Sequence, residues 1–148
     1  MKIDLDLSEL QKVTDKLNDL QINAEQFNQA AQGIRLILQA DVDQRFQSSP
    51  NTETGGQVWG GEQWSPLSRA YLGSHPRRIN GQILRDTGEL QQSFTAEGVS
   101  VFEVGDRELV FGSALPKASR LNRDRPIVFW HPVLIEKVAD FLVKFIDQ

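Results

Sequence analysis

The triplet Asp86-Thr87-Gly88 is the part of this sequence that comes closest to a catalytic motif. In aspartic proteases, two aspartates from such triplets lie about 3 Å apart, share one proton and activate a water molecule. The chain contains one Asp-Thr-Gly triplet, so a catalytic pair would require a symmetric dimer. Its neighbours are Arg85 and Glu89, whereas the protease triplet follows a buried apolar strand and precedes a small residue. Catalysis by Asp86 is therefore not the favoured interpretation.

A capping box explains the same residues better. Asp86 would accept a hydrogen bond from the backbone N–H of Glu89, while the Glu89 side chain would reach back to the N–H of Asp86. Leu90 and Phe94 then lie four residues apart, on one face of the helix that follows. The sequence thus predicts that Asp86 is a helix cap, with Thr87 and Gly88 as parts of the same structural motif.

No other set of residues predicts an enzyme. The two histidines, His75 and His131, lack metal-ligand spacing to a second histidine or to a pair of carboxylates. The glycines of residues 55–61 lack the lysine and the strand-to-helix setting of a phosphate-binding loop. The absence of cysteine excludes disulfides, thiolate metal sites and cysteine nucleophiles. We therefore expect no catalytic residue, no metal site and no cofactor.

The charges are distributed unevenly along the chain. Residues 69–85 contain basic side chains and no acid, and residues 117–125 contain four basic side chains and one acid, although the net charge is −4. Acids gather instead in the N-terminal third, with Asp4, Asp6, Glu9, Asp15, Asp19, Glu25, Asp41 and Asp43. Opposed basic and acidic faces would let copies of the chain dock head to tail, whereas the simpler alternative is two solvated loops. The candidate contact residues are Arg77, Arg78, Lys117, Arg120, Arg123 and Arg125.

Two helical segments are predicted in the first third of the chain. In residues 1–25, apolar residues recur at spacings of three and four after a candidate N-cap at Ser8, which predicts a helical N-terminal extension. A longer helix follows, with Asn23 and Gln26 as its capping pair. It should end near Ser48, because Pro50 disfavours helix in the residue before it. Its apolar stripe consists of Phe27, Ala30, Ile34, Leu38, Val42 and Phe46.

Residues 50–82 are predicted to form a loop, because glycine, proline and polar residues dominate their first part. A short helix closed by Gly73 interrupts this loop. Trp59 and Trp64 would be costly to leave in water, and burial on the core of the same chain is favoured over contact with a neighbouring subunit. Both tryptophans are also counted among the candidate interface residues.

The second half of the chain predicts a hairpin and a helix. Residues 99–112 alternate β-branched and aromatic residues around a Gly-Asp-Arg turn, and residues 113–126 resemble a polar, basic loop. Pro132 is a favoured first residue for the amphipathic helix that follows. The predicted class is α+β in a single domain, residues 1–148, with long N-terminal helices and a C-terminal helix packed on a small antiparallel β-sheet.

The composition restricts the class of protein only broadly. Hydrophobic and charged contents, 39% and 24%, are those of an ordinary globular chain. No apolar run approaches the roughly 20 residues of a membrane helix. The first ten residues carry acids among their leucines, which is not typical of a signal peptide.

Three segments, in this order, resemble the phage virion-morphogenesis or tail-completion family. In residues 61–68, GEQWSPLS, a Trp-x-Pro-Leu-Ser element containing Pro66 and Leu67 follows a polar glycine loop. Residues 83–94, ILRDTGELQQSF, are similar to the family's apolar-x-Asp-Thr-Gly-x-Leu-x-x-Ser helix. The third segment is Arg125-Pro126 before an apolar run and a last helix. The chain departs from the family pattern after the hairpin, where the family's histidine and glycine are missing.

The resemblance implies a structural, non-enzymatic protein at the head–tail junction, or neck, of a phage. Such proteins form rings that complete or terminate the tail and join it to the head connector. The implied partners are copies of the same chain, six or twelve in a ring, together with tail tube and sheath proteins and portal-side connector proteins. The implied locations are the virion neck or tail and, during assembly, the host cytoplasm.

Nucleic acid is the alternative partner. An accessory DNA- or RNA-binding module would use Arg77, Arg78, Arg120 and Arg123 as phosphate contacts. Within a ring, the basic residues of segment 113–126 would instead contact DNA that passes through the lumen. The negative net charge and the absence of a recognition-helix motif make the accessory module secondary to the ring. Contact with DNA in the lumen is also secondary, because many lumens of this kind are acidic, which lets DNA slide.

Overall fold

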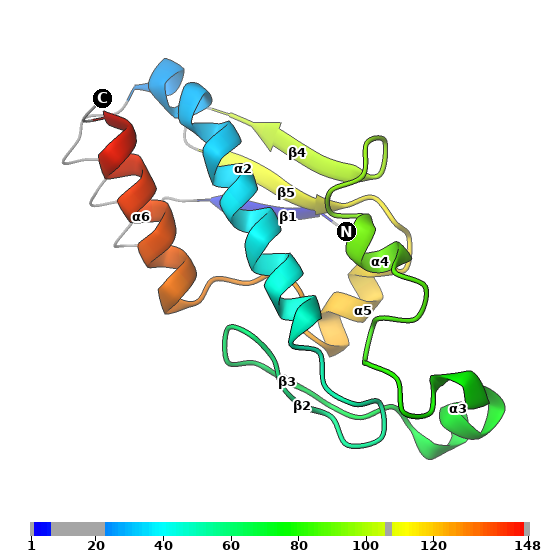
Figure 1. The fold of residues 1–148 in the computed structure, drawn as a ribbon. Coiled ribbons are helices and arrows are strands. Elements are labelled where there is room, and N and C mark those ends of the chain that lie inside the picture. Colours follow the sequence, from blue (N-terminus) through cyan, green and yellow to red (C-terminus); the bar gives the residue numbers. More distant parts are fainter. Residues whose placement is uncertain (1, 7–22, 106–107, 147–148) are drawn as a thin grey trace.

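The computed structural model describes residues 2–6, 23–105 and 108–146, which fold as an α+β protein (Figure 1). A three-stranded antiparallel sheet has the order β1-β5-β4. Helix α2 crosses one face of this sheet, and helix α6 packs beside α2. The predicted class is therefore confirmed. The bounds of these elements are Lys2–Asp6 for β1, Ala24–Gln47 for α2, Ser100–Val104 for β4, Glu108–Ser113 for β5 and Pro132–Ile146 for α6.

Helix α2 begins and ends as its sequence predicts. The Asn23 side chain accepts a hydrogen bond from the Gln26 backbone N–H at 2.8 Å, and Gln26 Oε1 accepts from the Asn23 N–H at 3.1 Å, which completes the capping box. Ser48 is the C-cap, two residues before Pro50. The whole predicted apolar stripe is buried against the rest of the molecule. Burial of one face thus reinforces the local signals at both ends of the helix.

The N-terminal extension is only partly described, and its described part contradicts the prediction. Residues 2–6 are not helical but form β1, in which Ile3 pairs with Phe111 and Leu5 with Leu109 of β5. The reason is visible in the sequence, since Ile3 and Leu5 alternate with charged residues at the period of a strand. The predicted helix through Leu10, Val13, Leu17 and Leu20 lies outside the described residues.

The hairpin and the C-terminal helix are confirmed. Strand β4 pairs with β5 in antiparallel register, with Phe102 opposite Phe111. Helix α6 begins at Pro132 and buries Leu134, Val138 and Leu142 in the core that α2 lines. None of the helices in the described ranges is long and apolar enough to span a membrane.

Segment 50–82 is irregular, as predicted, but it contains short pieces of regular structure. Two residues each, Gly56–Gln57 and Gln63–Trp64, form the strand pair β2-β3. The predicted short helix is α3 (Arg69–Ser74), capped by the Ser68 side chain, and the 3-10 helix η2 (Pro76–Arg78) follows it. These pieces form the end of the molecule that projects beyond the sheet and the two long helices (Figure 1).

The prediction that residues 113–126 form a loop is wrong, because helix α5 (Ala118–Asp124) lies within them. This helix has no side-chain cap, so its sequence lacks the local signal that would predict where it begins. Tertiary contacts stabilise it instead. Ala118 is fully buried, and Asn122 Oδ1 accepts hydrogen bonds from the backbone N–H groups of Ile127 and Val128. Packing of this kind decides whether a helix of two turns forms.

Candidate functional site

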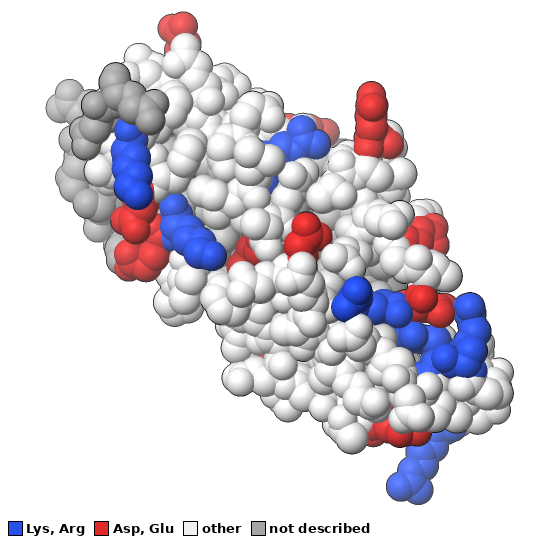
Figure 2. All heavy atoms as spheres, in the orientation of Figure 1, with Lys and Arg blue, Asp and Glu red and all other residues white. Residues whose placement is uncertain are grey.

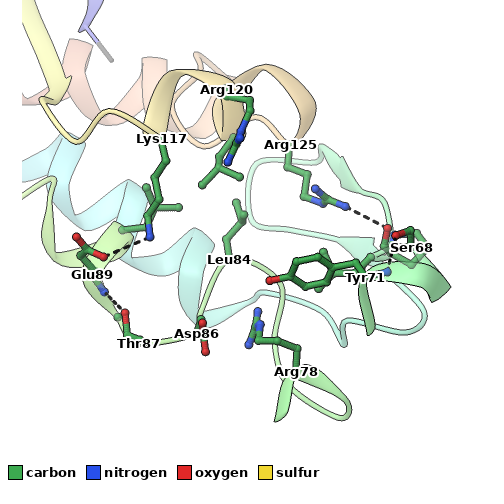
Figure 3. A pocket seen from close by; sticks show the side chains of 15 residues that line it. Ser68, Tyr71, Arg78, Leu84, Asp86, Thr87, Glu89, Lys117, Arg120 and Arg125 are labelled. Atoms are coloured by element: carbon green, nitrogen blue, oxygen red, sulfur yellow. Dashed lines mark hydrogen bonds and ion pairs between the residues drawn. The ribbon is translucent and has the colours of Figure 1, made fainter. Parts of the chain in front are cut away.

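A surface pocket of about 530 Å³ lies between α3, the Asp-Thr-Gly turn and α5 (Figure 3). Its lining comes mainly from three segments that are far apart in the sequence, residues 66–71, 84–90 and 117–125. These segments contain parts of the Trp-x-Pro-Leu-Ser, Asp-Thr-Gly and Arg-Pro elements described above. The fold therefore brings the three elements together at one site, although the first and third are separated by more than a third of the chain.

Direct hydrogen bonds join the first and third elements. Trp64 is fully buried, and its Nε1 donates to the backbone carbonyl of Pro126 at 2.8 Å. Arg125 forms two more hydrogen bonds between the same segments, because its Nε and Nη2 donate to the carbonyl oxygens of Ser65 and Pro66 at 2.9 and 3.1 Å. Trp-x-Pro and Arg-Pro thus form one interlocked unit on the wall of the pocket.

The predicted capping box at Asp86 is wrong. Helix α4 (Glu89–Gln92) begins after Gly88, whose φ of +86° places the N-cap in the left-handed region that favours glycine. This turn separates Asp86 from the helix start, and the Glu89 N–H donates instead to Thr87 Oγ1 at 3.3 Å. Asp86 forms an ion pair with Arg77 Nη2 at 2.7 Å. Leu90 and Phe94 are both buried, but they do not share one face of a helix as predicted, because α4 ends at Gln92.

Leu84 contributes an apolar surface at the centre of the pocket, as Figure 3 shows. Its backbone is left-handed, with φ of +61°, which is unusual for a residue that carries a Cβ. Hydrogen bonds hold the backbone of the preceding residue, Ile83, at both its N–H and its carbonyl group. The N–H of Ile83 donates to the carbonyl of Pro50 at 2.9 Å, and its carbonyl accepts from Ser49 Oγ at 2.5 Å. Such surroundings can maintain a strained residue, and strained residues occur preferentially at functional sites.

The pocket is positively charged in a protein of negative net charge. Four basic side chains and two carboxylates line it, which gives the lining a net charge of +2. Figure 2 shows Lys and Arg side chains gathered at the end of the molecule that carries α3. Lys117 pairs with Glu89 at 3.3 Å, whereas no hydrogen bond or ion pair joins Arg120 to another residue in the described part of the chain. Arg120 is therefore the basic side chain of the pocket that is free to meet a ligand.

Several predicted contact residues have internal roles. Trp64 is not accessible to a neighbour, and Trp59 is half-buried with its Nε1 bonded to Asp41 at 2.9 Å, so both tryptophans pack on their own chain. Arg78 is also buried, because its guanidinium donates to the carbonyl oxygens of Gln82 and Arg85. As surface contacts, Trp64 and Arg78 were therefore predicted wrongly.

The other basic residues remain on the surface, inside or outside the pocket. Lys117, Arg120 and Arg125 line it. Arg77 and Arg123 are exposed and lie outside its lining, and each is next to a carboxylate, Asp86 and Asp124 respectively. Of the four arginines proposed as phosphate contacts, one is thus buried and two are paired. No feature of the described residues favours the nucleic-acid alternative.

A second polar cluster, which was not predicted from the sequence, lies at the C-terminal half of α2 and is buried. The Asp41 carboxylate accepts from Arg45 Nη2 at 2.8 Å and lies 2.6 Å from His131 Nε2. Arg45 also donates to the carbonyl oxygens of Trp59 and Ile127, at 2.8 and 2.5 Å. Burial lowers the pKa of Arg45, and the adjacent Asp41 opposes this effect.

This Asp41 cluster fits a structural role. All its polar atoms are satisfied, since no buried side-chain nitrogen or oxygen in the described part of the chain lacks a hydrogen-bond partner. It joins α2 to the Trp59 loop and to the segment before α6. One signal was present in the sequence, because Asp41 and Arg45 are four residues apart and adjoin the buried stripe at Val42 and Phe46.

The described residues offer no group of three or more His, Asp or Glu side chains that would hold a metal ion. The lining of the pocket combines apolar residues, such as Leu84 and Leu121, with charged ones. No family model matches the chain, and neither a curated protein nor a solved structure is similar to it at a significant level.

Proposed function

We propose that this protein is a structural component of a phage neck, which forms a ring that completes or terminates the tail and joins it to the head connector. The observation that carries the proposal is the convergence of the three resembling segments around one pocket. Trp64 and Arg125 each donate across the junction between two of these segments. Segments that resemble a family pattern and also contact one another support the proposed function better than the same segments scattered over the surface would.

The chemistry of the shared residues supports a structural rather than a catalytic role. Asp86 is paired with Arg77, Gly88 supplies a left-handed turn, and Trp64 fills the core. Each of these residues shapes the chain or binds another part of it.

A ring also requires two different surfaces on each subunit, because neighbouring copies meet head to tail. On the face drawn in Figure 2, basic side chains gather at the α3 end, where the pocket supplies one candidate surface for such a contact. In the proposed neck, the partners are further copies of the chain, tail tube or sheath proteins and portal-side connector proteins. The proposed location is the virion neck or tail, after assembly in the host cytoplasm.

The experiment that tests this function is a measurement of mass in solution over a wide concentration range, followed by electron microscopy of every species larger than a monomer. We expect closed rings with a central hole, with six copies favouring a tail terminator and twelve favouring a head-side connector. If the isolated chain stays monomeric, it is added to purified tails and to portal complexes. A monomer that binds neither of them would overturn the proposal.

A further inference from the structure

Most of the basic side chains of the pocket at the α3 end come from one segment. Lys117, Arg120 and Arg125 belong to α5 and its two caps, whereas Asp86 and Glu89 lie on the facing segment. The remaining basic residue of the lining, Arg78, is buried. Between these two segments the surface is apolar, with Leu84 at its centre (Figure 3), and Leu121 also lines the pocket. A ligand that fits must therefore place an apolar group in the middle and its negative charge against α5.

The volume of the pocket restricts the size of that ligand. About 530 Å³ lies in the range of roughly 300–1,000 Å³ that is typical of ligand sites, and it accommodates a few side chains. Tyr71 forms part of the rim, and its ring is stacked on His75 with centroids 4.1 Å apart. His75, which does not line the pocket, therefore holds the Tyr71 ring in place, and this favours a preformed site.

The charges of the α5 wall are available for binding. Arg120 is exposed and has no partner among the described residues, and in Figure 3 its side chain extends toward the centre of the pocket. Lys117 has only the exposed pair with Glu89 at 3.3 Å. Pairs of this kind contribute little stability, so Lys117 can exchange Glu89 for a carboxylate of the ligand.

We infer that this pocket binds an acidic peptide segment of another protein, with an aliphatic or aromatic side chain inserted between Leu84 and Leu121 and carboxylates bound by Arg120 and Lys117. Recognition of acidic motifs by clustered basic side chains is a common mode of peptide binding. A nucleic-acid strand fits less well, because the surface between the charged residues is apolar and suits an aliphatic or aromatic side chain. That the segment belongs to a neck protein rests on the proposed function, whereas its chemistry rests on the pocket alone.

The test is selection of binders from a random peptide library on the purified protein, followed by affinity measurements with the selected peptides as synthetic, fluorescently labelled probes. Selected sequences should combine at least two acidic residues with an aliphatic or aromatic residue between them. Replacement of their acids by Asn or Gln should weaken binding by about tenfold or more.

The matched variants are Arg120→Glu and Arg123→Glu, two exposed arginines on the same short helix of which only Arg120 lines the pocket. Arg120→Glu should weaken peptide binding by about tenfold or more, and Arg123→Glu by less than about twofold. Thermal unfolding of both variants by circular dichroism checks that each one is folded. Equal losses in the two variants would overturn the inference.

Three other outcomes also contradict it. These are selected peptides without acidic bias, no enrichment above an unrelated protein, and Arg120-dependent binding of a short single-stranded oligonucleotide in place of peptide. The ring measurement is independent of this selection, since the pocket is present in each isolated chain. Failure of the peptide site and failure of the neck assignment are therefore distinguishable.

Discussion

Two aspartate–arginine pairs in the described part of the chain have nearly the same separation in opposite surroundings. Arg45 and Asp41 are 2.8 Å apart with side chains 0% and 7% exposed, and Arg77 and Asp86 are 2.7 Å apart with side chains 70% and 38% exposed. In the buried pair, both charges have lost water and depend on each other. In the exposed pair, water and salt screen the attraction. The same chemistry is therefore a structural requirement at one end of α2 and an adaptable surface feature near the pocket.

This contrast separates the two polar regions of the protein. The Asp41 cluster is closed, with Phe129 4.0 Å from the Arg45 guanidinium and every buried polar atom bonded. The pocket is open, and one of its basic side chains, Arg120, contacts no other described residue through a hydrogen bond or ion pair. A closed cluster stabilises one conformation, whereas an open one leaves charge available for a partner.

The largest effect should come from breaking the buried pair. Asp41→Ala leaves the Arg45 charge buried without its carboxylate and should lower the free energy of unfolding by about 3–5 kcal/mol. Asp86→Ala is the matched control at the exposed pair and should cost less than about 1 kcal/mol. Urea unfolding of both variants measures the difference. Equal losses would show that burial does not distinguish the two pairs.

A smaller effect is expected from crowding the buried cluster without changing its charges. Gly60 has φ of +100°, and a Cβ there would lie 2.8 Å from Arg45 Nη2 and 2.9 Å from the Phe129 ring. Gly61 has φ of +95° and no atom within 4 Å of the same position. Both alanine variants incur backbone strain, so Gly60→Ala should cost at least about 1 kcal/mol more than Gly61→Ala. Matched thermal unfolding curves measure this difference, and equal melting temperatures would contradict it.

The smallest effect concerns the wall of the pocket. Arg125→Ala removes two hydrogen bonds to the carbonyl oxygens of Ser65 and Pro66 and should cost about 1 kcal/mol. Arg123→Ala removes an exposed side chain whose nearest carboxylate is 3.6 Å away, and should change stability by less than about 0.5 kcal/mol. Chemical denaturation compares the two. A loss at Arg123 as large as that at Arg125 would mean that the interlocked unit contributes no stability.

Local signals were sufficient where neighbouring residues agree with one another. Helix α2 has a capping box at Asn23, an uninterrupted apolar stripe and a proline two residues after its C-cap, and all three were visible in the sequence. The β4-β5 hairpin and the start of α6 at Pro132 were predicted for the same reason. These elements are specified by interactions within a few residues, which is the range over which a sequence pattern acts.

Long-range packing decided the rest. Strand β1 pairs with the edge of β5, which is distant in the sequence. Helix α5 forms because Ala118 is buried and Asn122 accepts hydrogen bonds from the segment that follows. Asp86 does not cap α4, because the left-handed Gly88 turns the chain between them. The Asp41–His131 contact joins residues 90 positions apart. The sequence alone determined the fold class and its main helices, and only the tertiary structure decided which charges are buried together and which three segments form the pocket, because burial depends on neighbours that are distant in the chain.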